Sequence, residues 1–458
     1  MTPGRWPSAP CAPLGCVLAL CTLLVPCACS ATGVDAVLRC QPGGDRPECP
    51  SPSPSPAPPD DDPSTVWPSA LHAANSDPWL ARHHDQLTEM HPRLLVLNFH
   101  NPLPGDALLP SVQLEIEALA EGSRYHGYAD PAAPAFLRYE LVQIIDFTDA
   151  EVPADWPYDS STRLPVDALG QFVPEVLFTS EFAQQMQVPD PEAPGQNLDL
   201  CSIFERGIAN EVWLAVGDGM REPPLMLERK QRYDRQFAQL PGEFQPCVSA
   251  SDHCLDVQCG VTVRIAHLNP QRGPGCDLQV RGWSMLDAGR AIPYLADNAD
   301  PYFNADFSTR FSTPFDNLYE LCQNGADVCL AYPSSSSAEG VGAAGASWRI
   351  DPYLQGCGSP DFPPNATARW AWNDALPVDS RCEHYQLLDG EGQQDRYVPY
   401  SAASLPAYEP RLIGTDPFPG DCGGAWQLYW RQNMPGWNNP ALAVDGTAMK
   451  NWWPFNFY

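Results

Sequence analysis

The sequence predicts an α/β protein with a mainly parallel sheet and flanking helices, plus a loop-rich C-terminal region, rich in cysteine and tryptophan, that packs against it. Two observations lead to this fold class. Apolar runs of strand length alternate with stretches of helical periodicity from about residue 93 onward, as in a parallel sheet whose strands are joined by helices. Beyond about residue 320 this alternation fades, and cysteines and tryptophans become frequent.

Four apolar runs predict the strands, at residues 93–99, 137–147, 211–216 and 261–267. Ser111 is a suitable N-cap for a helix that carries Val112, Ile116 and Leu119 on one face. A second helix is expected at residues 200–206, because the glycine that follows is typical of a helix C-terminus. A third is expected to begin at Ser284, which has the spacing of a capping box.

The N-terminus is typical of a secretory signal, and residues 1–31 are expected to be a signal peptide. Arg5 supplies the positive charge, and residues 14–25 form an uncharged apolar run that is too short to span a bilayer. A partial lipoprotein box makes a lipid anchor at Cys27 the alternative. No later segment has about 18 uninterrupted apolar residues, so we expect no transmembrane helix in the mature chain. The expected location is secreted, or periplasmic or cell-surface.

Three further segments are expected after the signal. Residues 32–68 contain the run PSPSPSPAPPDDDP and predict a disordered, proline- and aspartate-rich spacer. Residues 69–320 are expected to form the α/β body. Residues 321–458 are expected to form the cysteine- and tryptophan-rich region of the same globular unit.

Cysteine usage agrees with export. Twelve of the 17 cysteines lie beyond the signal region, and an even number in an exported chain favours complete disulfide pairing. No Cys-x-x-Cys occurs among them, which disfavours a zinc site. Spacing alone favours the local pairs Cys40–Cys49, Cys254–Cys259 and Cys322–Cys329. The expected disulfide cysteines are Cys40, Cys49, Cys201, Cys247, Cys254, Cys259, Cys276, Cys322, Cys329, Cys357, Cys382 and Cys422.

The charge balance restricts the partners. With 26 basic and 56 acidic residues the net charge is −30, which disfavours nucleic acid and anionic membrane surfaces. An extracellular polymer or a small molecule is the expected partner, and hard cations are compatible with this charge.

Familiar catalytic motifs are missing or out of context. Residues 340–345 (GVGAAG) match a dinucleotide fingerprint only as a string, because four serines precede them instead of a strand. Residues 282–286 approach a nucleophile elbow but lack its second glycine. The early histidines, from His72 to His100, are expected to be solvated loop residues, with a metal site as the alternative.

The ends of the expected strands indicate a site. In open α/β sheets, ligands bind outside the carboxyl ends of the strands. Of the polar residues there, Asp146, Asp218 or Glu222 would act as acid and base, and His100 or His267 would orient a substrate or a divalent metal. No cofactor is otherwise expected. The expected substrate-binding residues are Asn101, Asn269, Trp370 and Trp372.

Aromatic residues crowd the C-terminal region. Flat aromatic faces beside polar groups are surfaces on which sugar rings stack, and tryptophan is also an ordinary core residue of disulfide-rich folds. We expect most of these side chains to belong to the core. The full set is Trp370, Trp372, Trp426, Trp430, Trp437, Trp452, Trp453, Tyr385 and Tyr429.

Several C-terminal motifs carry a resemblance. They are CGSPDFPPN at residues 357–365, WAWN at 370–373, SRC at 380–382, CGGAW at 422–426, YWRQNMPG at 429–436 and NWW at 451–453. This pattern resembles a family of exported bacterial and fungal proteins of undefined function, and the likeness would cover most of residues 93–458. The family usually has histidine where this chain has Asp361. The resemblance implies export and a single architecture, and it supplies no reaction.

Two functions follow as hypotheses. The first is a hydrolase of extracellular polymers such as glycans. The alternative is a non-catalytic protein that binds carbohydrate or a cell surface through a tryptophan-rich surface. Two carboxyl groups within roughly 5–10 Å of each other across an open cleft would favour a glycosidase, whereas separated or occupied carboxyl groups would favour binding. A third possibility is a structural surface protein.

Overall fold

A computed structural model describes the following parts of the chain: residues 62–72, 77–99, 105–148, 164–168, 171–216, 226–229, 231–233, 239–244, 255, 257, 259–269, 357–358, 363–365, 377–387, 396–413, 424–443 and 445–458. The chain divides into two compact units, residues 1–54 and 55–458, and every described residue belongs to the second unit. The expected helix at Ser284 and the glycine-rich stretch at 340–345 lie outside the described residues.

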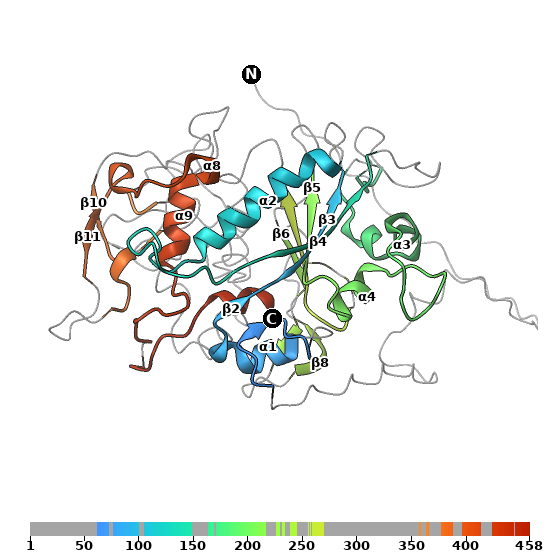
Figure 1. Cartoon of the computed structure of the whole chain (residues 1–458), viewed down its shortest axis with the longest axis horizontal. Coiled ribbons are helices and arrows are strands. Elements are labelled where there is room, and N and C mark those ends of the chain that lie inside the picture. Colours follow the sequence, from blue (N-terminus) through green and yellow to red (C-terminus); the bar gives the residue numbers. More distant parts are fainter. Residues whose placement is uncertain are drawn as a thin grey trace, which may run out of the picture. The chain divides into compact units, whose positions relative to one another are not determined.

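A five-stranded sheet forms the centre of this unit (Figure 1). Its spatial order is β4 (Glu140–Asp146), β3 (Arg93–Asn98), β5 (Glu211–Ala215), β9 (Val263–Leu268) and β6 (Met226–Arg229). The first four strands are parallel, and β6 is an antiparallel edge strand. The predicted fold class, a mainly parallel sheet with flanking helices, is confirmed.

The three inner strands are buried on both faces, which explains why most of their residues are apolar; β5 and β9 also bury the polar residues Glu211, Arg264 and His267. Alternate side chains enter two cores. The α2-side core includes Val96, Trp213 and Leu268, and the α4-side core includes Leu97 and Leu214.

The connecting helices cover opposite faces. Helix α2 (Gly105–Gly122) joins β3 to β4 and contributes Leu108 and Val112 to the α2-side core. The helices α3 (Ser180–Met186) and α4 (Leu200–Glu205) join β4 to β5 and line the other core. The chain therefore reverses its direction across the sheet at β3, and the carboxyl ends of β3 and β5 flank the switch point of a doubly wound fold.

Two helix predictions had different outcomes. Helix α4 was expected to end at Gly207, and this is confirmed: Gly207 follows its last turn with φ +62°, and Asp199 caps its first turn by accepting from the backbone N–H of Ser202. The prediction that Ser111 caps a helix is wrong. Helix α2 begins six residues earlier, at Gly105, and continues through Pro110. The Pro-Ser pair mimics a helix start, because proline is also typical of the first helical turn.

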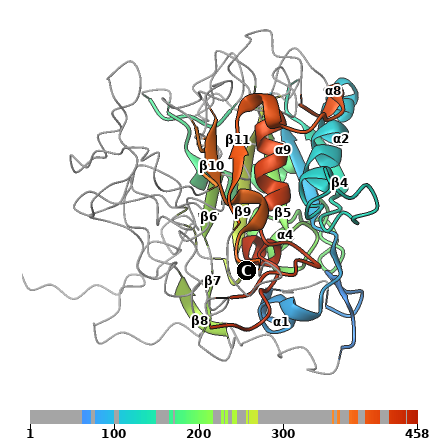
Figure 2. The same cartoon turned by 90° about the vertical axis from the view of Figure 1, so that its left-hand side faces the viewer.

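The C-terminal region packs on the α2 side of the sheet. Helix α9 (Gly424–Asn433) lies beside α2 (Figure 2). A Cβ atom at Gly122 would lie 2.9 Å from Cδ of Arg431, so only glycine permits this approach. The 3₁₀ helix η6 (Trp453–Phe457) packs against α1 (Asp77–His83). The core role expected for the tryptophans is confirmed for the fully buried Trp426, Trp430, Trp452 and Trp453.

Smaller elements complete the unit. They are the strands β7 (Gln231–Tyr233), β8 (Gln239–Phe244), β10 (Val378–Ser380) and β11 (Val398–Tyr400), the helix α8 (Pro410–Ile413), and the 3₁₀ helices η1 (His84–Gln86), η2 (Pro174–Phe178), η4 (Cys382–His384) and η5 (Ala402–Ser404). The strands β7 and β8, like β10 and β11, form antiparallel pairs. Among the described residues, no helix is both long and apolar enough to cross a bilayer.

The folded body begins inside the range expected for the spacer. Strand β1 (Val66–Trp67) pairs with β2 (Glu89–Met90), and Trp67 is completely buried. Asp62 is also buried, and it accepts a hydrogen bond from Ser69 Oγ at 2.7 Å. Residues 62–68 therefore belong to the body, because a buried tryptophan there contributes to its core.

Two disulfides lie among the described residues. Cys357 bonds to Cys382, and Cys201 bonds to Cys259, which joins α4 to the segment before β9. The expected local pair Cys254–Cys259 is therefore wrong: proximity in space, and not spacing along the chain, selects Cys201. The other eight predicted disulfide cysteines lie outside the described residues.

Candidate functional site

The carboxyl ends of the parallel strands meet at one edge, as the sequence predicted. Their registers place Asn98, Asp146, Ala215 and Leu268 side by side. Of the predicted site residues, Asp146, His267 and Asn269 are described, and the last two are buried. The others lie outside the described residues: His100, Asn101, Asp218, Glu222, Trp370 and Trp372.

The Asp146 carboxylate is occupied by structural hydrogen bonds. Its Oδ1 accepts from Asn98 Nδ2 at 3.2 Å and from the backbone N–H and hydroxyl of Thr148 at 3.0 and 2.7 Å. Its Oδ2 accepts from the Gly105 backbone N–H at 2.7 Å, at the start of α2. Burial by itself raises the pKa of Asp146, but the bonds from Thr148, Gly105 and Asn98 outweigh it and lower the pKa below its usual value. An ionised carboxylate of this kind fastens β3, β4 and α2 together and is a poor general acid.

His267 points to the opposite face of the sheet. Its strand neighbours Ala266 and Leu268 belong to the α2-side core, so His267 faces the α4 side, where its Nε2 lies 3.4 Å from the Val216 carbonyl oxygen. Asp146 bonds to α2 on the other face. The structure therefore does not bring these two predicted catalytic residues into one pocket.

Two of the early histidines are structural. His72 and His84 are buried, and they pair with Asp62 and Asp85 at 3.2 and 3.1 Å, so the expectation of solvated loop histidines is wrong for these two. Each becomes part of the packing once the segment before β3 folds onto the body. No three His, Cys, Asp or Glu side chains of the described ranges are grouped so that they could hold a metal ion.

A second polar group lies between α2, α9 and the C-terminal strands. We call it the tyrosine cluster, and it comprises Tyr125, His126, Tyr128, Glu383, His384, Tyr400, Tyr408, Tyr429, Gln432 and Asn433. These residues come from the turn after α2, from η4, from β11, from the segment before α8 and from α9. Parts of the chain that are hundreds of residues apart are thus joined by polar side chains.

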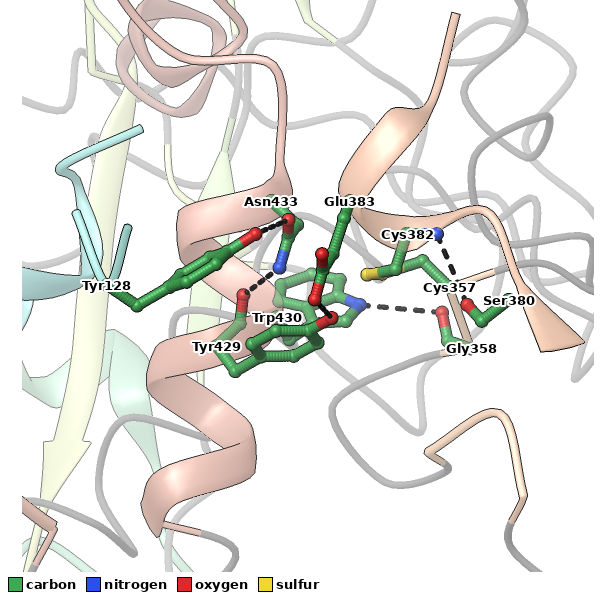
Figure 3. Close-up of a disulfide and its surroundings, with 9 residues drawn as sticks. All are labelled: Tyr128, Cys357, Gly358, Ser380, Cys382, Glu383, Tyr429, Trp430 and Asn433. Carbon is green, nitrogen blue, oxygen red and sulfur yellow. Dashed lines mark hydrogen bonds between the residues drawn. A yellow bond between two sulfur atoms is a disulfide. The ribbon is translucent and has the colours of Figure 1, made fainter. Parts of the chain in front are cut away.

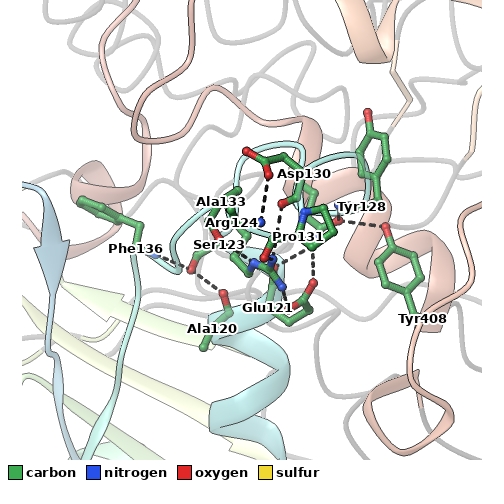
Figure 4. Close-up of polar contacts among 12 residues, drawn as sticks. Ala120, Glu121, Ser123, Arg124, Tyr128, Asp130, Pro131, Ala133, Phe136 and Tyr408 are labelled. Atoms are coloured by element: carbon green, nitrogen blue, oxygen red, sulfur yellow. Dashed lines mark hydrogen bonds and ion pairs between the residues drawn. The ribbon is translucent and has the colours of Figure 1, made fainter.

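The turn after α2 is shaped by Arg124 (Figure 4). Its guanidinium donates to Glu121 Oε2 at 2.6 Å and to the carbonyl oxygens of Ala133 and Pro131 at 2.8 and 2.6 Å. His126 lies two residues further along the turn and has φ +51°. Its backbone N–H donates to the Gln432 carbonyl oxygen at 2.8 Å. The turn is therefore fixed to the end of α9.

Gln432 and Asn433 at the end of α9 organise the tyrosines. The Gln432 side-chain oxygen accepts from Tyr408 OH at 3.0 Å and from the Tyr128 backbone N–H at 3.2 Å. Asn433 Oδ1 accepts from Tyr128 OH at 2.9 Å (Figure 3). Both amide side chains are buried, so the hydroxyl groups are held in fixed positions.

Glu383 is placed beside these tyrosines by η4. The disulfide between Cys382 and Cys357 anchors this 3₁₀ helix, and the Cys382 backbone N–H donates to Ser380 Oγ at 3.2 Å. Tyr429 OH donates to Glu383 Oε1 at 2.8 Å (Figure 3). Glu383 is half-buried and forms no ion pair with any residue that the structure describes.

The pKa values of the side chains in the cluster are shifted mainly by burial, and those of three tyrosines also by the charge of Glu383. Burial raises the pKa of Tyr128, Tyr408 and Tyr429 far above the usual value, and the negative charge of Glu383 raises each pKa further. Burial and the nearby charge of His384 lower the pKa of His126 to about 4, although a hydrogen bond with Asn433 acts the other way. Near neutral pH the His126 ring is therefore uncharged.

Two buried polar atoms of the cluster have no hydrogen-bond partner in the described part of the chain. They are Nε2 of His126 and the hydroxyl oxygen of Tyr400, whose side chain is only 2% exposed. Buried polar groups are nearly always paired, because an unpaired one costs about 1–3 kcal/mol. Other buried polar atoms without a partner among the described residues lie outside the cluster, so these two mark polar capacity in the cluster and do not by themselves locate a ligand.

Only part of this cluster is apparent in the sequence. Tyr429 stands out among the C-terminal aromatic residues, whereas Glu383, His126 and Tyr128 do not. Two signals were available: a carboxylate directly after a disulfide cysteine, and the dense aromatic run RYHGY at residues 124–128. Neither signal reveals that the two segments meet.

Comparison with known proteins adds no relative, since no family model, no curated protein and no solved structure matches this chain. The chemistry of the tyrosine cluster is therefore the basis for assigning a function.

Proposed function

We propose that this protein is exported and binds a hydroxyl-rich extracellular polymer, in particular a glycan, at the tyrosine cluster without cleaving it. The observation that carries this proposal is a pair of polar atoms without a partner in the described part of the chain, His126 Nε2 and Tyr400 OH, in a cluster that also contains the half-buried Tyr128 and Tyr408. Sugar hydroxyl groups both donate and accept hydrogen bonds, so one sugar can serve both kinds of atom.

The residue types of the cluster suit a sugar. Tyr128 and Tyr408 are half-buried, so each keeps part of its ring exposed. Aromatic faces pack against the apolar faces of sugar rings, while amide, carboxylate and hydroxyl groups fix their orientation. Because the side chains of Gln432 and Asn433 hold the tyrosine hydroxyl groups in place, little conformational entropy would be lost on binding.

Binding is favoured over hydrolysis by the state of the carboxylates. A glycosidase needs two carboxyl groups that flank the bond to be cleaved. Glu121, the other carboxylate of the region, is occupied by Arg124 and by Gln432 Nε2 at 2.9 Å. Asp146 is occupied in the same way by its four donors. Glu383 is then the one cluster carboxylate with an oxygen available for a ligand.

Export is proposed from the signal-like N-terminus together with the disulfides. Cys201–Cys259 and Cys357–Cys382 require an oxidising compartment to persist. Such a compartment is also where extracellular glycans are met.

The test compares two Tyr→Phe variants by isothermal titration with tetrasaccharides of glucose, N-acetylglucosamine and glucosamine. Tyr400→Phe removes a buried hydroxyl group that has no partner among the described residues, so it should not lower the melting temperature, whereas it should weaken tetrasaccharide binding about fivefold. The matched control is Tyr139→Phe, whose hydroxyl group donates to Glu211 at 2.9 Å in the sheet. This control should lower the stability and leave binding unchanged.

Two outcomes would contradict the proposal. One is the absence of binding by the wild-type protein to all three tetrasaccharides. The other is binding that Tyr400→Phe leaves unchanged. A release of reducing ends from any tetrasaccharide by the wild-type protein would instead favour the hydrolase.

A further inference from the structure

We infer that the tyrosine cluster recognises a positively charged amine on the polymer, such as the free amino group of an amino sugar. This inference rests on the proposed glycan-binding function and adds the charge of the ligand to it. The structural basis is a carboxylate that lies among tyrosine rings and has no ion-pair partner in the described part of the chain.

Glu383 forms no ion pair with a cation among the described residues, although His384 follows it in η4. One of its oxygens accepts from Tyr429 OH at 2.8 Å, and neither an arginine nor a lysine pairs with it in the described ranges. The guanidinium of Arg124 is occupied by Glu121 and by backbone carbonyl groups. The guanidinium of Arg381 lies over the Tyr385 ring, 5.4 Å from its centroid. A half-buried carboxylate in this situation attracts a cationic ligand group more strongly than a neutral one.

The surrounding rings add to this preference. The ring centroids of Tyr128 and Tyr400 lie 5.3 and 5.9 Å from that of Tyr429. An ammonium group is attracted by the negative face of an aromatic ring, and of these three residues Tyr128 is half-buried while Tyr400 and Tyr429 are buried. The effect of the Glu383 charge on the pKa of Tyr128, Tyr408 and Tyr429 supports their proximity to the carboxylate.

The His126 ring does not repel a cation. His126 is uncharged near neutral pH, because burial and the charge of His384 lower its pKa to about 4. The net charge of −30 attracts polycations over a longer range and repels acidic polymers.

The experiment measures binding at pH 6 by isothermal titration. The glucosamine tetrasaccharide carries charged amines, the N-acetylglucosamine tetrasaccharide has the same rings with neutral amides, and the glucose tetrasaccharide has neither. The wild-type protein should bind the glucosamine form at least tenfold more tightly than the other two. Glu383→Gln keeps the acceptor for Tyr429 but removes the charge, so this variant should lose that tenfold preference and bind the neutral tetrasaccharides within twofold of the wild-type protein.

Glu140→Gln is the control, because Glu140 is an exposed carboxylate of the edge strand β4; its side chain is 57% exposed. This variant should keep the full preference. Tetramethylammonium distinguishes an amino sugar from a quaternary head group. If the sugar is required, millimolar tetramethylammonium should displace less than a tenth of the bound glucosamine tetrasaccharide, and complete displacement would overturn the assignment to an amino sugar.

Failure of the inference can be separated from failure of the proposed function. Equal binding of all three tetrasaccharides, or an undiminished preference in Glu383→Gln, overturns the amine inference and leaves glycan binding intact. The absence of binding to all three overturns both. The melting temperature of Glu383→Gln should stay within a few degrees of the wild-type value, since the hydrogen bond from Tyr429 is retained.

Discussion

Glu211 provides a sharp test of what holds the sheet together. It begins β5, and its carboxylate is completely buried. Its Oε1 accepts from Trp213 Nε1 at 2.6 Å, and its Oε2 accepts from Tyr139 OH at 2.9 Å. The register between β5 and β9 also places Arg264, which is 1% exposed, in the position next to Glu211 on the same face.

The substitution Glu211→Leu should destabilise the protein by about 2–6 kcal/mol. It leaves two buried donors, on Trp213 and Tyr139, without this acceptor, and each such loss costs about 1–3 kcal/mol. The substitution also removes a buried carboxylate from the strand position next to Arg264. We therefore expect the loss of unfolding free energy to lie in the upper half of this range. Urea unfolding followed by tryptophan fluorescence measures the change.

A double-mutant cycle separates the hydrogen bond from other effects. Trp213→Phe removes one donor, so the cost of Glu211→Leu should be about 1 kcal/mol or more smaller in that background. Glu140→Gln, on the exposed edge strand, should change the stability by less than about 0.5 kcal/mol. The reasoning would be refuted by a cost of Glu211→Leu below about 1 kcal/mol, or by strictly additive effects of the two substitutions.

Three further predictions concern other parts of the body. Deletion of residues 62–68 should lower the unfolding free energy by at least about 3–5 kcal/mol, because it removes the completely buried Trp67. Between pH 6.5 and about 4 the stability should fall by about 1–3 kcal/mol as pH decreases, because the His126 ring gains a proton in the unfolded chain before it does so in the folded one; His126→Gln should flatten this dependence. Replacing both Cys201 and Cys259 by alanine should cost about 4 kcal/mol, since their bond closes a loop with a sequence separation of 58.

Each of these predictions has a control in the same chain. Deletion of the proline-rich residues 50–59 should leave the melting temperature unchanged, and a clear fall would contradict the spacer prediction. His91→Gln should keep the pH dependence below pH 6.5 that His126→Gln removes; if both variants behave alike, His126 is not its source. Removal of the Cys357–Cys382 bond, with a separation of 25, should cost about 3.5 kcal/mol, and a larger cost than for Cys201–Cys259 would contradict the loop-length reasoning.

The fold class was accessible from the sequence because its signals are local. Strands that are buried on both faces are mostly apolar, so residues 93–99 and 211–216 are recognisable as strands without knowledge of their neighbours. The end of α4 was accessible for a similar reason, since Gly207 adopts a positive φ that glycine tolerates best. The start of α2 was not, because its first N–H group is satisfied by Asp146, a residue 41 positions away.

The partner of Cys259 and the arrangement of the predicted site residues could not be predicted from short stretches of sequence. Pairing Cys259 with Cys201 rather than with Cys254 requires the path of the chain across the sheet. Asp146 and His267 both end predicted strands, and only the alternation of side chains in the assembled sheet separates them onto opposite faces.

The sequence by itself therefore determined the alternation of strands and helices, the acidic charge and the apolar residues available for a core, because each depends on residue type and short spacing. Tertiary structure alone decided that Glu383, His126 and Tyr429 share one cluster. These residues come from η4, from the turn after α2 and from α9, and they meet because α9 packs against α2 while the bond between Cys357 and Cys382 anchors η4 beside them. Contacts between such distant segments arise from packing of the whole body, and no periodicity within any one of the three segments predicts them.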